Sequence, residues 1–280
     1  GPLGALLTSR LPIPALHVTH GPLDPVPTEI YAGIARHSPM LRLVAISEAQ
    51  RAMAPGLPFA GVCYNGLPLP SAPFRAVPDG YLAFLGRMSP EKGPADAIRI
   101  AKRAGLPLLI GAKCREPAEH AYFAQHVAPR LGSDVVWLGE LNAAEKFELL
   151  AGARALLFPI AWPEPFGMVM IEAMACGTPV LATAHGSVPE VVADGVTGFV
   201  RATPDALIEM VPRIDEIDRG ACRRRVAELF SAEAMTAGYE RLVRAELAAA
   251  RRQVITLTPL DGHAAGGILV PRVEVAGAGA

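Results

Sequence analysis

Two glutamates eight residues apart enclose a short glycine-containing segment, Glu164-Pro165-Phe166-Gly167 through to Glu172. Pro165 suits the approach to a helix, and Gly167 would leave the first backbone amides of that helix unobstructed. Bare amides at the positive end of a helix dipole attract anions. Glu172 lies about two turns further along, where its carboxylate could accept hydrogen bonds from the diol of a ribose. Glu164, outside the helix, could bind a second sugar beyond the phosphates, so the pattern fits a nucleotide sugar.

A plainer interpretation of the same residues stays open at this point. Glu164 could be a solvated acid in a loop and Glu172 an exposed helix residue, while Phe166, Met170 and Met174 simply fill the core. Two glutamates at this spacing are a weak pattern by themselves.

Further blocks accompany the two glutamates in a fixed order. Gly86-Arg87-Met88-Ser89-Pro90-Glu91-Lys92-Gly93 precedes them, and Gly177-Thr178-Pro179-Val180, Gly186-Ser187-Val188-Pro189-Glu190-Val191-Val192 and Asp194-Gly195-Val196-Thr197-Gly198-Phe199 follow. Together the blocks resemble the donor-site signature of the retaining glycosyltransferases of family 4, also described as glycosyl transferases group 1. Members of that family have GT-B architecture and use nucleotide-activated sugars. The resemblance therefore implies the same fold and the same class of reaction here.

The region after residue 78 alternates short apolar strands with amphipathic helices. We expect strands at residues 81–85, 106–110, 135–138, 155–158 and 179–182, and helices at residues 94–104, 117–131, 143–151, 166–176, 205–217, 220–230 and 232–252. This alternation is typical of a doubly wound, Rossmann-like parallel sheet with helices on both faces. Because ligands bind at the carboxyl ends of such strands, Arg87, Glu140 and Glu164 should gather at one edge of the sheet.

The first 78 residues predict a smaller unit of the same class. We expect strands at residues 15–19, 43–46 and 61–64, a helix at residues 28–37, and a second helix to residue 53 with Ser47 as its N-cap. Prolines at 68, 70, 73 and 78 mark a linker over residues 67–78. We divide the α/β chain into a partial N-terminal, acceptor-side domain with linker (1–78), a complete donor nucleotide-sugar-binding domain (79–252) and a Gly/Ala/Pro-rich tail (253–280), for which the composition predicts partial disorder. Weak strand patterns lie in that tail at residues 268–270 and 273–275.

The resemblance also implies a role for each candidate residue. Arg87 and Lys92 would neutralise the donor pyrophosphate, the amides of residues 166–169 would hold the distal phosphate, and Glu172 would bind the ribose and Glu164 the transferred sugar. Residues 139–141 would border the base. The donor-binding residues implied in this way are Gly86, Arg87, Lys92, Gly139, Leu141, Glu164, Phe166, Gly167, Met168, Val169 and Glu172.

His20 ends the first predicted strand, and a lone histidine is usually structural. In the family, a histidine at the end of the matching strand points into the interdomain cleft near the reacting sugar. We therefore assign the catalytic set to His20, Arg87, Lys92 and Glu164, with His17 as a structural residue. The resemblance further implies transfer with retention at the anomeric carbon and without a metal ion. Glu190, Trp137 and Trp162 are interpreted as structural, Glu190 as an acid at the start of its own helix.

Composition narrows the class of protein. The 280 residues carry a formal net charge of −1 and are 51% apolar, which favours a soluble globular protein and gives no reason to expect a nucleic-acid partner. The four cysteines form no metal-binding or CxxC pattern, so we expect reduced thiols in the cytoplasm. One long apolar run without Asp, Glu, Lys or Arg, residues 173–189, is interrupted by Gly177, Pro179 and Gly186, so no transmembrane segment is expected. Peripheral contact with a membrane stays open.

The N-terminal part is short for a member of this family, whose two domains are of comparable size. We expect the first part of that domain to be missing here, or to be completed by another chain. The leading hypothesis is a hexosyltransferase that uses a UDP- or GDP-linked sugar, with no separate cofactor and an unidentified acceptor. The alternatives are a catalytically incompetent nucleotide-sugar-binding fragment and, less favoured, a nucleotide-sugar epimerase of GT-B fold. A Rossmann dehydrogenase is disfavoured, because no GxGxxG follows the strand predicted at residues 81–85.

Overall fold

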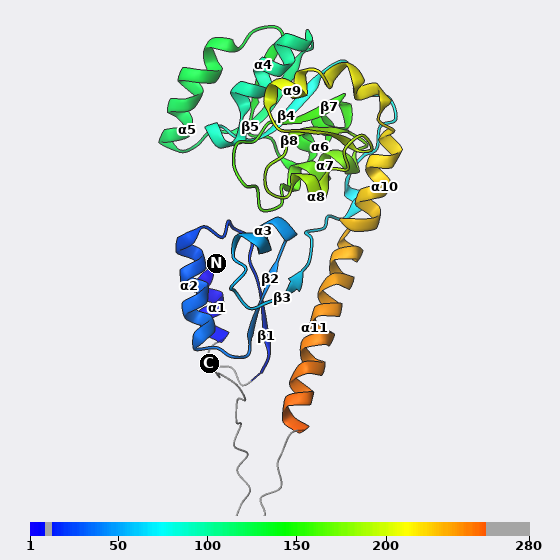
Figure 1. Ribbon diagram of the computed structural model, residues 1–280. Coiled ribbons are helices and arrows are strands. Elements are labelled where there is room, and N and C mark those ends of the chain that lie inside the picture. The colour runs from blue at the N-terminus through cyan, green and yellow to red at the C-terminus, as the bar shows by residue number, and fades with distance from the viewer. Residues whose placement is uncertain (9–12, 256–280) are drawn as a thin grey trace, which may run out of the picture.

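The computed structural model describes residues 1–8 and 13–255 and contains two parallel β-sheets, one above the other in Figure 1. The larger sheet has the strand order β6-β5-β4-β7-β8-β9, and the smaller has the order β1-β2-β3. All of the pairings within the two sheets are parallel. The predicted α/β class with two Rossmann-like sheets is therefore confirmed. The domain limits at residues 78 and 252 stay predictions.

The larger sheet consists of apolar strands that helices cover on both faces. Its members are β4 (Leu82–Arg87), β5 (Leu108–Lys113), β6 (Val135–Gly139), β7 (Ala155–Phe158), β8 (Val180–Thr183) and β9 (Gly198–Arg201). Every residue of β7 and β8 is buried, which explains their uninterrupted apolar sequences. The sequence did not predict β9, whose edge position leaves Val200 and Arg201 only half-buried.

The helices around the larger sheet are α4 (Pro94–Ala104), α5 (Pro117–Tyr122), α6 (Ala143–Gly152), α7 (Met168–Ala175), α8 (Val188–Val191), α9 (Pro204–Ile208) and α10 (Arg219–Leu229). Two predicted helices are shorter than expected. The one at residues 117–131 passes into a π-type turn (Phe123–Val127) and a 3₁₀ turn (Ala128–Arg130). The one at residues 205–217 breaks after α9, and a 3₁₀ turn (Val211–Glu216) containing Pro212 follows. Proline lacks the amide that a continuing helix needs.

The smaller unit contains β1 (Ala15–Val18), β2 (Leu41–Ala45) and β3 (Phe59–Val62), with α1 (Pro2–Thr8), α2 (Pro25–Arg36) and α3 (Glu48–Met53). Helix α1 was not predicted. The predicted N-cap of α3 is confirmed, because the Ser47 hydroxyl accepts a hydrogen bond from the Gln50 amide at 2.9 Å. A short 3₁₀ turn (Leu69–Ser71) lies in the linker, and a second (Pro90–Lys92) follows β4.

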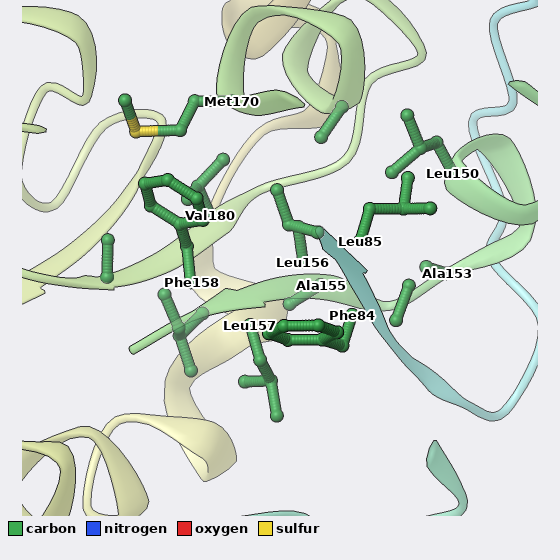
Figure 2. Packing of buried hydrophobic residues seen from close by; sticks show 14 of the residues in the cluster. Phe84, Leu85, Leu150, Ala153, Ala155, Leu156, Leu157, Phe158, Met170 and Val180 are labelled. Atoms are coloured by element: carbon green, nitrogen blue, oxygen red, sulfur yellow. The ribbon is translucent and has the colours of Figure 1, made fainter. Parts of the chain in front are cut away.

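The core of the larger unit lies between the central strands and the helices packed on them. Phe84 of β4 lies beside Leu157 of β7 on one side of the sheet, and Leu85 lies on the other side with Leu156 of β7 and Leu150 of α6 (Figure 2). Phe84 and Leu156 are fully buried. Burying a side chain of this size contributes about 1.5–3 kcal/mol. This packing fixes β4 and β7, the strands that lead into the predicted site.

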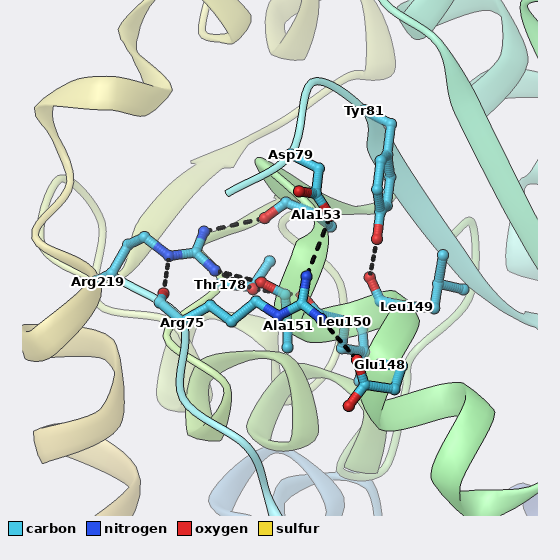
Figure 3. A network of polar contacts seen from close by, with 10 residues as sticks. All are labelled: Arg75, Asp79, Tyr81, Glu148, Leu149, Leu150, Ala151, Ala153, Thr178 and Arg219. Atoms are coloured by element: carbon cyan, nitrogen blue, oxygen red, sulfur yellow. Dashed lines mark hydrogen bonds and ion pairs between the residues drawn. The ribbon is translucent and has the colours of Figure 1, made fainter. Parts of the chain in front are cut away.

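A half-buried arginine, Arg219 at the start of α10, reinforces the amino ends of these strands (Figure 3). Its guanidinium donates to the carbonyls of Arg75, Ala151 and Ala153 at 2.7–2.9 Å, and to the Thr178 hydroxyl at 2.9 Å. The carbonyls of residues 151 and 153 lie at the C-terminal end of α6, where a positive charge is favourable. Arg219 thus ties the linker to α6 at the end of the sheet away from the carboxyl edge.

Helix α11 (Ala232–Ile255) connects the two units and runs alongside the smaller one in Figure 1. Gly238 allows this close approach, because a Cβ there would stand 2.7 Å from the Cys63 sulfur. Arg42 and Glu246 add an ion pair at 3.8 Å. None of the helices described is long and apolar enough to cross a membrane. The strand patterns predicted at residues 268–270 and 273–275 lie outside the described residues.

Candidate functional site

A cleft of about 320 Å³ opens at the carboxyl edge of the larger sheet, beside the first turn of α7. Its walls combine strand ends, the loop that carries Glu164 and one side of α7. The lining residues are Leu85, Gly86, Lys92, Gly111, Ala112, Lys113, Glu140, Leu141, Lys146, Phe158, Glu164, Gly167, Met168, Val169 and Glu172. The structure therefore brings Gly86, Lys92, Leu141, Glu164, Gly167, Met168, Val169 and Glu172 together, as the sequence predicts.

Helix α7 begins at Met168, two residues later than predicted, so Gly167 is its N-cap. Gly167 has φ +75°, and a Cβ there would stand 2.6 Å from the terminal carbon of Met170. The position therefore requires glycine, and glycine leaves the helix amides uncovered toward the cleft. At the other end of α7, Gly177 has φ +85°, as predicted for a left-handed helix terminus.

The side chain of Phe166 lies in the core, as the plainer interpretation of the segment had it. Its side chain is 2% exposed, and its ring packs against the rings of Tyr64 at 6.1 Å and Phe230 at 5.8 Å between centroids. Phe166 is absent from the cleft lining, so its side chain belongs to the core beneath the loop.

Glu164 belongs to a compact cluster with Lys92 and Trp162. The Lys92 ammonium stands 2.6 Å from Oε2 of Glu164, and the Trp162 indole donates to the same oxygen at 3.0 Å. The ammonium also lies 4.4 Å from the centroid of the Trp162 ring, within the range of a cation–π contact. The Lys92 and Glu164 side chains are 15% and 11% exposed. Glu164 is thus not the solvated loop acid of the plainer interpretation.

Glu172 forms a second pair with a lysine, at the far side of the helix tip. Its Oε1 stands 2.6 Å from the ammonium of Lys146, a residue of α6. The Glu172 side chain is 15% exposed, so the alternative of an exposed helix residue is wrong as well. A third lysine in the lining, Lys113 at the end of β5, lies 3.7 Å from the Glu119 carboxylate. Two of the acids in the cleft, Glu164 and Glu172, are therefore paired with lysines that could also bind phosphate.

The sequence reasoning missed Lys113 and Lys146 and interpreted Trp162 as packing only. Lys113 follows the apolar run of β5, so the rule that places ligands at carboxyl ends could have found it. Lys146 lies on the first turns of an amphipathic helix, and only the packing of α6 against α7 brings it to Glu172. No sequence spacing records that contact.

Arg87, Gly139 and His20 do not line the cleft. Arg87 is the last residue of β4, and its guanidinium pairs with Glu91 at 3.0 Å while its side chain is 49% exposed. Gly139 ends β6 with φ +78°. His20 lies in the smaller unit, exposed, just after β1. His17 is held by Tyr31, with 3.2 Å between its Nε2 and the tyrosine oxygen, and burial lowers the pKa of its imidazole.

A family model identifies the group to which this arrangement corresponds. The model described as "Glycosyl transferases group 1" matches residues 73–219, more than half of the chain. The chain belongs to this family. The match contains the Gly86–Gly93 block, the whole Glu164–Glu172 segment and every residue of the cleft lining.

Individual proteins support the same placement. A curated relative, the alpha-maltose-1-phosphate synthase of Mycolicibacterium smegmatis, is 37% identical over 125 residues, which are 42% of this chain and 32% of the relative. The chain thus spans about a third of that protein's length. The sucrose-phosphate synthase of Thermosynechococcus elongatus has a similar fold, with a TM-score of 0.75, 22% identity and coverage of 88% of this chain and 71% of that one. Anabaena HepE, solved in complex with UDP-glucose, has a TM-score of 0.70 at 19% identity, with coverage of 87% and 75%.

Proposed function

We propose that this chain binds a nucleotide sugar in the cleft beside α7 and takes part in the transfer of its hexose to an acceptor. The observation that carries the proposal is the pair of lysine–glutamate contacts, Lys92–Glu164 and Lys146–Glu172, on either side of an uncovered helix tip. Family membership supports the reaction class, and the UDP-glucose bound to HepE favours a uridine nucleotide over GDP.

Binding would exchange the partners within these pairs. The donor diphosphate would lie at the amides of Met168 and Val169 and take the Lys92 ammonium from Glu164. The freed Glu164 carboxylate would then accept hydrogen bonds from hydroxyls of the hexose, with the Trp162 indole still holding one of its oxygens. On the other side, Glu172 would bind the ribose diol while Lys146 keeps its carboxylate in place. Each charge would be partnered both before and after binding.

The same groups would lower the barrier to transfer. As the bond from the anomeric carbon to the phosphate oxygen breaks, negative charge grows on the departing diphosphate, where Lys92 and the helix tip stabilise it. The acceptor hydroxyl would attack the anomeric carbon from the side that the phosphate leaves, and its proton would pass to a phosphate oxygen. This course retains the anomeric configuration and needs no metal ion. His20 would contribute from the smaller unit, next to the reacting sugar.

Thermal unfolding in the presence of nucleotides tests the binding step. A ligand that binds the folded state raises the melting temperature. We expect UDP and UDP-hexoses to raise it for the wild type, and we expect Glu172→Ala, still folded, to lose the effect. Glu216→Ala, at an exposed ion pair with Arg213, is the matched control and should respond like the wild type. A Glu172→Ala protein that responds like wild type would show that the ribose assignment is wrong.

A binding unit without turnover is the second candidate function. One observation favours it: Arg87 and His20, two residues of the predicted catalytic set, stand outside the cleft. Release of UDP from a UDP-hexose, with water taking the hexose as the acceptor, separates the candidates, with a Lys92→Ala, Glu164→Ala double variant as the background. Saturable binding with UDP release no higher than this background would establish the binding unit, whereas turnover above it would establish the transferase.

A further inference from the structure

We propose that Glu190 is a positioning residue that fixes the loop carrying His20 against the loop carrying Glu164, through a continuous series of hydrogen bonds between the two units. The proposal rests on the proposed function for the roles of His20 and Glu164. The contacts themselves do not depend on it. Glu190 belongs to the Gly186–Val192 block, to which the proposed function gives no part.

The first contact joins α8 to the Glu164 loop. The Ser187 amide donates to the Glu164 carbonyl at 2.9 Å. Gly186 lies directly against the same residue, because a Cβ at position 186 would stand 2.3 Å from the Glu164 carbonyl oxygen and 2.4 Å from its nitrogen. Such a distance excludes any side chain there, so the start of α8 and the Glu164 backbone hold each other in one position.

Helix α8 is anchored within the larger unit at its other end. Arg225 of α10 donates to the carbonyls of Glu190 and Val191 at 2.7 and 2.8 Å. These carbonyls belong to the last turn of α8, where a guanidinium is favourable. The backbone of Glu190 is therefore fixed, and its side chain alone reaches out to the smaller unit.

The second contact crosses from α8 to α3. The Glu190 carboxylate accepts hydrogen bonds from the amides of Glu48 at 2.8 Å and Ala49 at 2.6 Å, the first residues of α3. It also accepts from the Tyr64 hydroxyl at 3.1 Å. Burial and the neighbouring Glu190 raise the pKa of Tyr64 to about 12, so this hydroxyl keeps its proton and stays a donor. Glu190 thus satisfies free amides of another helix, instead of acting on its own helix as the sequence suggested.

The third contact joins α3 to the His20 loop. Gln50 of α3 is fully buried, and its side-chain nitrogen donates to the carbonyls of Thr19 at 3.0 Å and Gly21 at 2.7 Å. Its side-chain oxygen accepts from the Ile46 amide at 2.9 Å and from the Thr19 hydroxyl at 3.2 Å. Thr19 and Gly21 are the neighbours of His20 on either side. A buried amide with every donor and acceptor used holds one arrangement of its surroundings.

Together the contacts set where His20 stands relative to Glu164. The donor site lies entirely in the larger unit, so a donor can bind it wherever the smaller unit stands. The chemistry of the transferred sugar, in contrast, needs His20 at a fixed position relative to the Glu164 loop. Loss of the Glu190 contact should therefore impair turnover while donor binding continues. A purely stabilising contact would instead lower the melting temperature and leave the turnover of folded protein unchanged.

Amide hydrogen exchange of the free protein tests the series of contacts without any ligand. Peptides covering residues 17–22 and 46–52 report on the His20 loop and on the start of α3. We expect Glu190→Ala to exchange at least tenfold faster than wild type in residues 46–52 and severalfold faster in residues 17–22. The control Glu216→Ala should match wild type in both peptides. Unchanged exchange in residues 17–22 would overturn the link to the His20 loop, whatever happens at α3.

Kinetics of the conservative variant Glu190→Gln test the consequence. The substitution keeps the shape of the side chain but replaces one carboxylate oxygen with an amide nitrogen, which cannot accept a hydrogen bond from α3. We expect its Kd for UDP to stay within twofold of wild type while kcat for the UDP-hexose falls at least tenfold. Equal kcat for wild type and Glu190→Gln would refute the positioning role, as would a loss of UDP affinity of the same size as the loss in kcat. A wild type without UDP binding would refute the proposed function instead, and the exchange experiment would still decide the contacts.

Discussion

Removing the Lys92 charge should destabilise the protein far more than removing the Glu164 charge with which it pairs. The two side chains are 15% and 11% exposed, and their atoms stand 2.6 Å apart. Breaking a fully buried pair by removing one partner costs about 3–5 kcal/mol, so a pair with this slight exposure should cost about 2–3 kcal/mol in Lys92→Met. The remaining carboxylate cannot reach water easily, and among the described residues it keeps only the Trp162 indole as a side-chain donor.

Glu164→Gln should cost less, about 1 kcal/mol, because the flexible lysine can carry its ammonium to solvent and glutamine can still accept from the indole. The double variant removes both charges, and its free energy of unfolding should lie close to that of Glu164→Gln. The coupling energy between positions 92 and 164 is then about 2 kcal/mol, well above the level expected for exposed pairs.

Urea unfolding of the four proteins measures this coupling. Tryptophan emission is a suitable probe, because Trp137 and Trp162 are the only two tryptophans of the chain and both belong to the larger unit. Arg213→Met, at an exposed ion pair with Glu216, is the control and should leave the transition unchanged. Additive effects of the two single substitutions would refute the view that Lys92 and Glu164 depend on each other for stability.

Two further perturbations address the neighbours of Glu164. In a Trp137→Phe protein, the fluorescence of Trp162 should change when UDP-hexose binds, because the Lys92 ammonium would leave its place 4.4 Å from the ring. A Trp162→Phe protein should lose most of this response. An equal response from Trp137 would contradict the reasoning. Gly186→Ala should destabilise by at least about 2 kcal/mol and weaken UDP-hexose binding at least tenfold, because its Cβ would overlap the Glu164 backbone at φ +56°. The matched control is Gly195→Ala, where φ is +72° but nothing lies within 4 Å of the added carbon, so only about 1 kcal/mol of backbone strain is expected and binding should persist.

Elements bounded by clear local signals were the ones that the sequence predicted best. Helix α4 and strand β7 have the predicted limits, because Gly93 and Gly105 bound the first, and the second is a short apolar run between α6 and the Glu164 loop. Strand β9 was missed because it is a short edge strand in a glycine-rich segment. Helix α1 was missed because Gly4 argues against a helix, whereas contact with α2 and β1 favours one.

The residues of the candidate site show the same difference between local sequence signals and long-range packing. Gly167, Glu164 and Glu172 could be predicted because a strand end, a glycine and a helix leave local marks in the sequence. The partners of the two acids could not be predicted in the same way. Lys146 reaches Glu172 only because α6 packs on α7, and Glu190 reaches α3 only because the two units meet. Long-range contacts of this kind follow from the packing of whole elements, which no short motif encodes.

In each of the two pairs the glutamate competes with a ligand for its lysine, and this competition can determine which ligand binds. A free pyrophosphate could take Lys92 from Glu164, but it would leave a carboxylate of 11% exposure without its cation. A free monosaccharide has no phosphate to offer Lys92, so it would have to bind Glu164 while Lys92 still occupies a carboxylate oxygen. A nucleotide sugar supplies both replacements at once, a phosphate for the lysine and hydroxyls for the acid. A ligand that replaces only one partner of the Lys92–Glu164 pair leaves the other partner without a contact, which costs free energy. This cost gives selectivity for the complete donor without any contact beyond those already present in the cleft.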